Sequence, residues 1–278
     1  MKLEKIVCLK EECDRILEPY KRDFDIIEMY TEQELEERLK EEDVKSKILL
    51  IAATDETIAI GKKYDVATMA YANPELGNQT YAGVEMLVEG FEEVDADFLE
   101  KVYQRWHHMP WTILETERCI VRELTLDDMN GLFALYADEG MDAYTEPLYP
   151  YEEEMEYQRA YINHMYRYFG YGMWLVFLKE NGKLIGRAGL EHREIQEQTE
   201  LELGYLIGKS YQGKGYATEV CKAIIDYAKE NTEFERINCI VEEGNTISMH
   251  LAVKLGFEER ETYDFDGKIM HRFVRELS

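Results

Sequence analysis

The sequence predicts an α/β protein of two domains, and three observations favour this fold class. The chain has 278 residues, whereas one domain commonly takes roughly 100–200. The apolar run Ile48–Ala53 is typical of a buried parallel strand, and residues that can cap a helix follow it directly. In the second half, a strand at 201–207 ends in a glycine-bearing loop that leads into an amphipathic helix. We place the first domain at residues 1–109, a linker at 110–116 and the second domain at 117–278.

The first domain shows alternating strand and helix patterns. Thr54 and Asp55 can cap the helix that follows the first apolar run, because their side chains accept hydrogen bonds from backbone N–H groups. A strand–helix–strand order predicts a parallel sheet, so we expect a small Rossmann-like α/β domain. The expected elements are a charged helix at 31–42, strands at 48–53, 66–71 and 85–88, and helices at 56–64 and 95–105.

Residues 48–103 resemble, in pattern alone, the second half of the haloacid-dehalogenase-like phosphatase fold. The catalytic motif of that family is an apolar strand followed by Asp-x-Asp-x-Thr/Val, and it is missing here. Asp23–Asp25 follows a polar stretch, and Asp264–Gly267 favours a hairpin turn. We therefore expect no phosphatase chemistry and treat the first domain as non-catalytic.

The second domain begins with a strand at 119–124. Thr125 can cap the next helix, and Asp127 and Asp128 stand in its first turn, where the helix dipole favours carboxylates. Asn181-Gly182 is a strong hairpin signal between two strands. The other expected elements are a tyrosine- and glutamate-rich helical segment at 150–168, strands at 174–178, 184–192, 201–207 and 237–241, helices at 215–230 and 246–255, and a hairpin at 259–273.

The loop Gln212–Ala217 joins a strand to the start of a helix. At such a junction, unpaired backbone N–H groups converge and the helix dipole presents its positive end, which suits an anion. Glycines 213 and 215 let the backbone approach phosphate oxygens closely. Two other phosphate motifs do not fit. The spacing of Gly204 and Gly208 is one residue too short for a P-loop, and no third glycine completes a dinucleotide fingerprint after Gly215.

The pattern that fits is Gln/Arg-x-x-Gly-x-Gly/Ala, present as Gln212–Ala217. A second signature follows, with Asn245-Thr246-Ile247-Ser248 and then Lys254-Leu255-Gly256-Phe257. On these motifs and the order of elements, residues 116–278 resemble the Gcn5-related N-acetyltransferase (GNAT) superfamily. Together with the Asn-x-x-Ser form, Arg118–Leu124 is most similar to the branch that acetylates the N-termini of ribosomal proteins. The resemblance implies a mixed, mostly antiparallel sheet with a splayed strand pair.

The resemblance also implies acetyl-CoA as acyl donor. Backbone N–H groups of the loop would bind its pyrophosphate, and the pantetheine arm would pair like an extra strand with the preceding strand. A backbone N–H there would polarise the thioester carbonyl. The implied cofactor contacts are Tyr205, Leu206, Ile207, Gln212, Gly213, Lys214, Gly215, Tyr216, Ala217, Asn245 and Ser248.

Direct attack by an amine needs a group that removes the amine's proton. Glu202 is the first candidate, because some family members place a glutamate on this strand, and Glu191 is the second; an outward-facing structural carboxylate is the alternative for Glu202. Many family members carry a tyrosine that protonates the leaving thiolate, but Ala252 holds that position here. Ser248 is the substitute candidate, with a cofactor contact or a helix cap as its alternative role.

Tyr144, Glu146 and Tyr149 are candidates for the acceptor wall. They belong to an anionic, aromatic segment that also holds Tyr151, Glu153 and Glu154 and that suits an amine through charge and cation–π contact. An ordinary solvated helix with packed tyrosines is the equal alternative. The acceptor itself, a small molecule or a peptide amine, is not identified by the sequence.

Composition excludes several other classes. The formal charge of −26 opposes binding to a nucleic-acid backbone. The five cysteines show no zinc-site spacing, and the adjacent His107 and His108 lack a third ligand, so we expect no metal. We also expect no membrane partner and a cytoplasmic location, because no apolar run approaches a membrane span and the first residues lack the core of a signal peptide.

Alternatively, the chain is an acyl-CoA-binding regulatory or interaction protein with little or no turnover. The absence of the family's tyrosine, where Ala252 stands, suggests this alternative. The oligomeric state is open, and a homodimer is compatible with the sequence.

Overall fold

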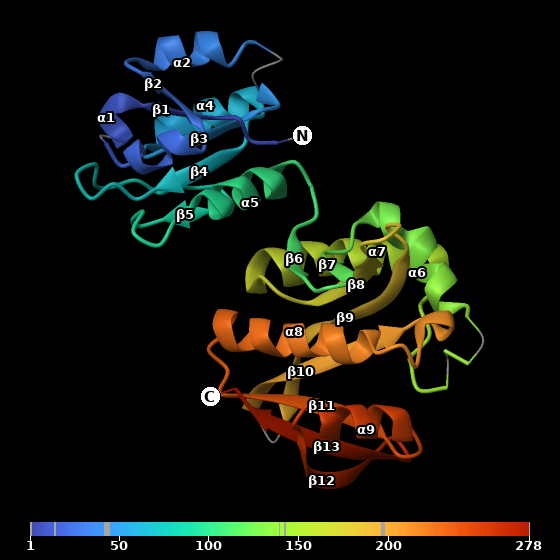
Figure 1. Cartoon of the computed structure of the whole chain (residues 1–278). Helices are drawn as coiled ribbons and strands as arrows, with labels where there is room; N and C mark the ends of the chain where they lie inside the picture. The colour runs from blue at the N-terminus through green and yellow to red at the C-terminus, as the bar shows by residue number, and fades with distance from the viewer. Residues whose placement is uncertain are drawn as a thin grey trace. The chain divides into compact units, whose positions relative to one another are not determined.

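The computed structural model describes residues 2–13, 15–41, 45–138, 140–141, 143–195 and 198–277. The chain forms two compact units, Met1–Trp111 and Thr112–Ser278 (Figure 1). The boundary lies inside the predicted linker. Residues 112–115 do not link the units but form strand β6 (Thr112–Glu115), which pairs with the next strand of the second unit. Among the described residues, no helix is long and apolar enough to cross a membrane.

The first unit is a five-stranded parallel sheet in the order β2-β1-β3-β4-β5, as predicted for its class. Apolar side chains fill both faces: α5 covers one, with Leu99 and Tyr103, and α2 and α4 cover the other, with Leu35 and Ile58. The sequence reasoning missed β1 and β2. The elements are β1 (Lys5–Leu9), α1 (Lys10–Cys13), η1 (Glu18–Arg22), β2 (Asp25–Met29), α2 (Glu32–Arg38), β3 (Ile48–Ala52), α4 (Asp55–Tyr64), β4 (Thr68–Tyr71), β5 (Leu87–Val88) and α5 (Ala96–Trp106).

The second unit is an eight-stranded sheet in the order β12-β13-β11-β10-β9-β8-β7-β6. All neighbouring strands are antiparallel except β10 and β11, which confirms the mixed, mostly antiparallel sheet. The elements after β6 are β7 (Cys119–Arg122), η2 (Leu126–Asp128), α6 (Met129–Tyr136), α7 (Tyr151–Tyr161), the π-helical η3 (Ile162–Phe169), β8 (Met173–Leu178), β9 (Leu184–Ile195), β10 (Gln198–Ile207), η4 (Lys209–Tyr211), α8 (Tyr216–Asn231), β11 (Arg236–Glu242), α9 (Thr246–Lys254), β12 (Glu258–Phe265) and β13 (Lys268–Glu276).

Helix α8 packs lengthwise against the sheet beside β9 and β10 (Figure 1). Its apolar stripe of Val220, Cys221 and Ile224 is fully buried in the same cluster as Leu201 and Leu203 of β10. Each such side chain contributes roughly 1.5–3 kcal/mol when it leaves water. The packing therefore fixes the end of β10, and with it the loop before α8, to the main core.

The β12–β13 turn is built as predicted. Asp266 and Gly267 both have positive φ, of 50° and 80°, which a tight type I′ hairpin requires. The turn brings the tip of this hairpin beside the carboxyl end of β11, because β13 pairs with β11 along seven residues.

Candidate active site

Strands β10 and β11 pair over a short distance and then separate. Their parallel register contains only Leu201 with Ile237 and Glu202 with Asn238, although β10 continues to Ile207 and β11 to Glu242. On its other side, β10 pairs with β9 along its whole length. The edge of β10 from Leu203 onward is therefore open toward β11, as the resemblance implied for a splayed strand pair.

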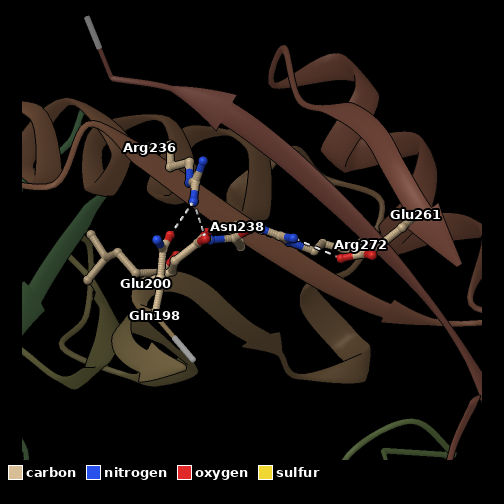
Figure 2. Close-up of polar contacts among 7 residues, drawn as sticks. Gln198, Glu200, Arg236, Asn238, Glu261 and Arg272 are labelled. Carbon is tan, nitrogen blue, oxygen red and sulfur yellow. Dashed lines mark hydrogen bonds and ion pairs between the residues drawn. The ribbon is translucent and has the colours of Figure 1, made fainter. Parts of the chain in front are cut away.

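A buried polar cluster holds the closed end of this pair (Figure 2). The Glu200 carboxylate accepts hydrogen bonds from Asn238 Nδ2 at 2.7 Å and from Arg272 Nη2 at 2.8 Å, and it also pairs with Arg236. Arg272 Nε donates to Asn238 Oδ1 at 2.8 Å, and its Nη1 reaches Glu261 at 2.8 Å. These contacts join β10, β11, β12 and β13, directly before the point where β10 and β11 part.

The charges in this cluster are compensated. Burial works to raise the pKa of Glu200, but the hydrogen bonds from Arg236 and Asn238 and the charge of Arg272 outweigh it, so the pKa is lowered. Removing one member would leave the others buried and unpaired, which is more costly than the net value of the contacts. Glu200, two residues before Glu202 on β10, is thus a structural carboxylate.

A cavity of about 1490 Å³ opens where the strands part. It is bounded by the strand ends, by α7 and η3, by the loop at 143–147, and by the β12–β13 hairpin. The predicted residues that line it are Tyr144, Glu146, Glu191, Glu202, Tyr205, Asn245 and Ser248. The sequence-predicted base, acid and part of the acceptor wall are thus brought to one cavity.

Glu202 and Glu191 lie directly opposite each other on β10 and β9, so both carboxylates point to the same face. Burial raises the pKa of Glu202; Arg193 opposes this rise, and the neighbouring charge of Glu191 adds to it. The Glu202 side chain is 13% exposed, and its Oε2 pairs with Arg193 Nε at 2.5 Å. Glu191 accepts a hydrogen bond from the Tyr161 hydroxyl at 3.3 Å. A carboxylate with a raised pKa on a cavity wall is a candidate proton acceptor.

The Tyr205 hydroxyl is buried beside the open edge of β10, and none of its contacts has full hydrogen-bond geometry. Burial raises its pKa, and the nearby Ser248 hydroxyl counteracts this. Asn245 begins α9, and its Oδ1 accepts the backbone N–H of Ser248 at 3.2 Å. Ala252 is buried in the core and does not line the cavity. Ser248 and Tyr205 are therefore the hydroxyl groups that α9 and β10 bring to the opening.

The start of α8 has the backbone form that the loop motif implied. Gly213 and Gly215 have φ of 72° and 85°, a region that favours glycine. A Cβ atom at Gly213 would meet nothing within 4 Å. Gly215 caps the helix without a side-chain hydrogen bond. In α4 and α5, by contrast, Thr54 and Asp95 fill that role. The first N–H groups of α8 thus have no side-chain cap among the described residues, as an anion site requires.

Side chains around the loop hold its shape. Gln212 Nε2 donates to the carbonyl of Ile207 at 2.8 Å, and Lys214 Nζ donates to the carbonyl of Ser210 at 2.8 Å. The sequence reasoning assigned no role to Arg118. Its guanidinium pairs with Glu219 at 2.6 Å, donates to the carbonyl of Lys214 at 3.1 Å, and stacks 4.2 Å from the centre of the Tyr216 ring. The arginine ties the loop to α8 and to the start of β7.

The acceptor wall differs from the prediction in two respects. Tyr149 is exposed and does not line the cavity. Its ring centre lies 5.6 Å from that of Tyr157, which lines the cavity instead. The β12–β13 hairpin contributes Tyr263, Phe265 and Asp266, which no sequence signal assigned to the site. This hairpin reaches the site through the pairing of β13 with β11. Such a long-range pairing leaves no local signal in the sequence, so the sequence could not assign these residues to the site.

Two further features concern metals and cysteines. Among the residues that the structure describes, no group of three His, Cys, Asp or Glu side chains is placed to hold a metal ion. All five cysteines are buried and free. Cys239, on the cavity wall, has a pKa raised to about 12, mainly by burial and further by Glu202.

Comparison with known proteins agrees with this geometry. A family model described as an acetyltransferase (GNAT) domain matches residues 118–258. An uncharacterised protein of Bacillus subtilis, YkkB, is 28% identical over 155 residues, which cover 54% of this chain and 88% of that protein. Spermidine N(1)-acetyltransferase of Escherichia coli is 27% identical over 124 residues, covering 45% of this chain and 61% of that protein. A ribosomal-protein-S5-alanine acetyltransferase structure from Vibrio fischeri matches with a TM-score of 0.52 at 16% identity, covering 59% of this chain and 95% of that one.

Proposed function

The chain belongs to the GNAT acetyltransferase family, and from this premise we propose that it moves an acetyl group from acetyl-CoA to the primary amine of a cationic acceptor in the cavity between β10 and β11. The observation that carries the proposal is the early end of the β10–β11 register, which opens a free strand edge beside two facing carboxylates. Membership of the family accounts for acetyl-CoA as donor, whereas the acceptor and the residue roles belong to the proposal.

The described residues fit the donor. The start of α8 offers backbone N–H groups without a side-chain cap, at a glycine loop with room for an approaching group. The free edge from Leu203 to Leu206 offers backbone groups that β11 does not pair to an extended arm. Acetyl-CoA, when bound, supplies an acetyl group activated as a thioester. Residues 205–207 and 212–217 would hold it, with Asn245 at the start of α9.

Glu202 takes the proton of the attacking amine, and Glu191 keeps the pKa of Glu202 raised and is the second candidate for this role. Ser248 donates a hydrogen bond to the sulfur as it leaves with negative charge, since Ala252 provides no hydroxyl. The new bond joins the amine nitrogen to the acetyl carbon, and the carbon–sulfur bond breaks. The sulfur finally takes one proton from solvent, while Glu202 releases one.

The first test is release of free CoA from acetyl-CoA by the purified chain with a panel of amines. We expect turnover with at least one class among polyamines, amino sugars and peptide N-termini. Ser248→Ala should lower kcat about tenfold, whereas Ser210→Ala, a serine outside the cavity, serves as control. CoA binding in calorimetry without turnover on any amine would contradict the proposal and favour a binding protein.

A further inference from the structure

The cavity wall carries more carboxylates than cations. Seven carboxylate side chains line it, against two arginines and one lysine. Each of those cations is already in an ion pair with a lining carboxylate: Arg193 with Glu202 at 2.5 Å, Lys268 with Glu242 at 2.7 Å, and Arg272 with Glu261 at 2.8 Å. Within the described part of the chain, four lining carboxylates are left without an ion pair: Glu146, Glu191, Glu194 and Asp266.

These four carboxylates lie in two regions of the cavity. Glu191 and Glu194 belong to β9, and Glu191 faces the proposed base, Glu202. Glu146 and Asp266 belong to the loop at 143–147 and to the β12–β13 turn. The pKa of Lys268, next to the turn, is raised mainly by Glu242 and further by the charge of Glu146. The loop and the turn are therefore close in space.

We propose that the acceptor is a linear di- or polyamine, whose reacting nitrogen lies at Glu202 and Glu191 and whose second, cationic nitrogen lies between Glu146 and Asp266. This inference rests on the proposed acetyl transfer and specifies its substrate class. A second positive charge near carboxylates without an ion pair gains Coulomb energy, and because Glu146 and Asp266 are exposed, salt should screen this gain. Tyr144 and Phe265, on the same loop and turn, offer ring faces to methylene groups and to the cation.

The same wall is poorly suited to a peptide. Peptide carbonyl groups need hydrogen-bond donors when they leave water. The cationic donors on the wall, Arg193, Lys268 and Arg272, are already engaged by carboxylates. The protonated nitrogens of a polyamine have donors alone, which matches the carboxylates of this wall.

The test compares acceptors of equal chain length under saturating acetyl-CoA: butylamine with one cation, 1,4-diaminobutane with two, and 4-aminobutanoate with the second charge reversed, with spermidine as the longer case. We expect kcat/KM for 1,4-diaminobutane to exceed that for butylamine at least tenfold, to fall with added salt, and to be lowest for 4-aminobutanoate. Equal values for butylamine and 1,4-diaminobutane would overturn the inference, as would a faster reaction with a peptide whose N-terminal amine is its only cation.

Variants separate the second-cation region from the reacting centre. The double variant Glu146→Gln with Asp266→Asn should reduce the ratio of kcat/KM for 1,4-diaminobutane over butylamine at least fivefold. The matched control, Asp226→Asn with Glu230→Gln, makes the same charge change at two exposed positions of α8 and should leave the ratio as it is. An unchanged ratio in the double variant would overturn the inference while acetyl transfer stands. Absence of CoA release with every amine would instead refute the proposed function.

Discussion

In each unit, a glutamate lies where the pairing of two parallel strands ends: Glu12 lies beyond the ends of β1 and β3, and Glu202 lies on β10 beside β11. The two glutamates differ in how many of their hydrogen-bond partners the protein supplies. In the first unit, β1 and β3 stay in register through Cys8 and Ile51. Glu12, 2% exposed, accepts hydrogen bonds from the Ala53 backbone N–H at 2.7 Å and from the hydroxyls of Thr54 and Thr57 at 2.7 and 2.6 Å. The protein itself therefore supplies three hydrogen-bond donors to this carboxylate.

In the second unit, β10 and β11 leave their register at Glu202 and Asn238. Glu202 has one cationic partner, a raised pKa and a cavity in front of it. Backbone and hydroxyl groups thus satisfy the carboxylate of Glu12, whereas the separation of β10 and β11 leaves Glu202 with fewer partners, and we therefore propose that Glu202 takes part in the chemistry.

The largest expected effect comes from the open end. Glu202→Gln removes the proposed proton acceptor but keeps the shape of the side chain, so kcat/KM should fall about 10²–10⁴-fold. The measurement is CoA release under saturating acetyl-CoA, with binding of CoA as a check that the site is intact. A loss of less than tenfold would shift the role of base to Glu191, and Glu191→Gln should then show the large loss.

A change at Glu12 in the first unit should lower the stability of the fold. Glu12→Ala removes the acceptor of the buried Ala53 backbone N–H, of the buried Thr57 hydroxyl and of the half-buried Thr54 hydroxyl, which should lower the free energy of unfolding by about 3 kcal/mol. Urea unfolding followed by circular dichroism measures this change. Glu11→Ala, at the exposed neighbouring position, is the matched control and should change it by less than about 0.5 kcal/mol. Similar shifts in both variants would mean that Glu12 is not structural.

A third change sharpens the contrast within the second unit. Glu200→Gln weakens the cluster that holds β10 and β11 together, so the position of the free strand edge should become less defined. We expect the Kd of CoA to rise about tenfold, or about 1.4 kcal/mol. Adenosine 3′-phosphate 5′-diphosphate lacks the pantetheine arm, so its Kd should stay the same. An equal weakening of both ligands would show that the cluster supports the whole fold rather than the strand edge.

The smallest expected effect is in pH dependence. The proposed base works only when ionised, so kcat/KM should fall as pH drops through the pKa of Glu202. Because burial raises this pKa above the ordinary range, the fall should begin at a higher pH than for a free carboxylate. Arg193 lowers the pKa of Glu202, so Arg193→Gln should move the acidic limb to still higher pH. A limb that stays in place or moves to lower pH would exclude Glu202 as the titrating group.

The sequence was sufficient for the fold class of both units and for the loop before α8, because apolar periodicity, capping residues and glycines are local signals. It was not sufficient for β6, which is short and lies at the sheet edge. Nor did it assign Arg118, Phe265 or Asp266 to the site, since their places depend on pairing between distant strands. Glu200 and Glu202 show this limit most clearly, because they share one face of β10. Only Glu200 is bound by Asn238 and by arginines of other strands, which makes it structural, and the sequence does not show this difference.

The protonated state of Cys239 has a practical consequence for handling the enzyme. Burial raises the pKa of this thiol to about 12, so it stays protonated at neutral pH, and the thiolate is the reactive species. Alkylating reagents and disulfide exchange with the free CoA that accumulates during turnover should therefore be slow at this position. In assays that follow CoA release with a thiol-reactive dye, Cys239 should therefore add little to the signal of the product.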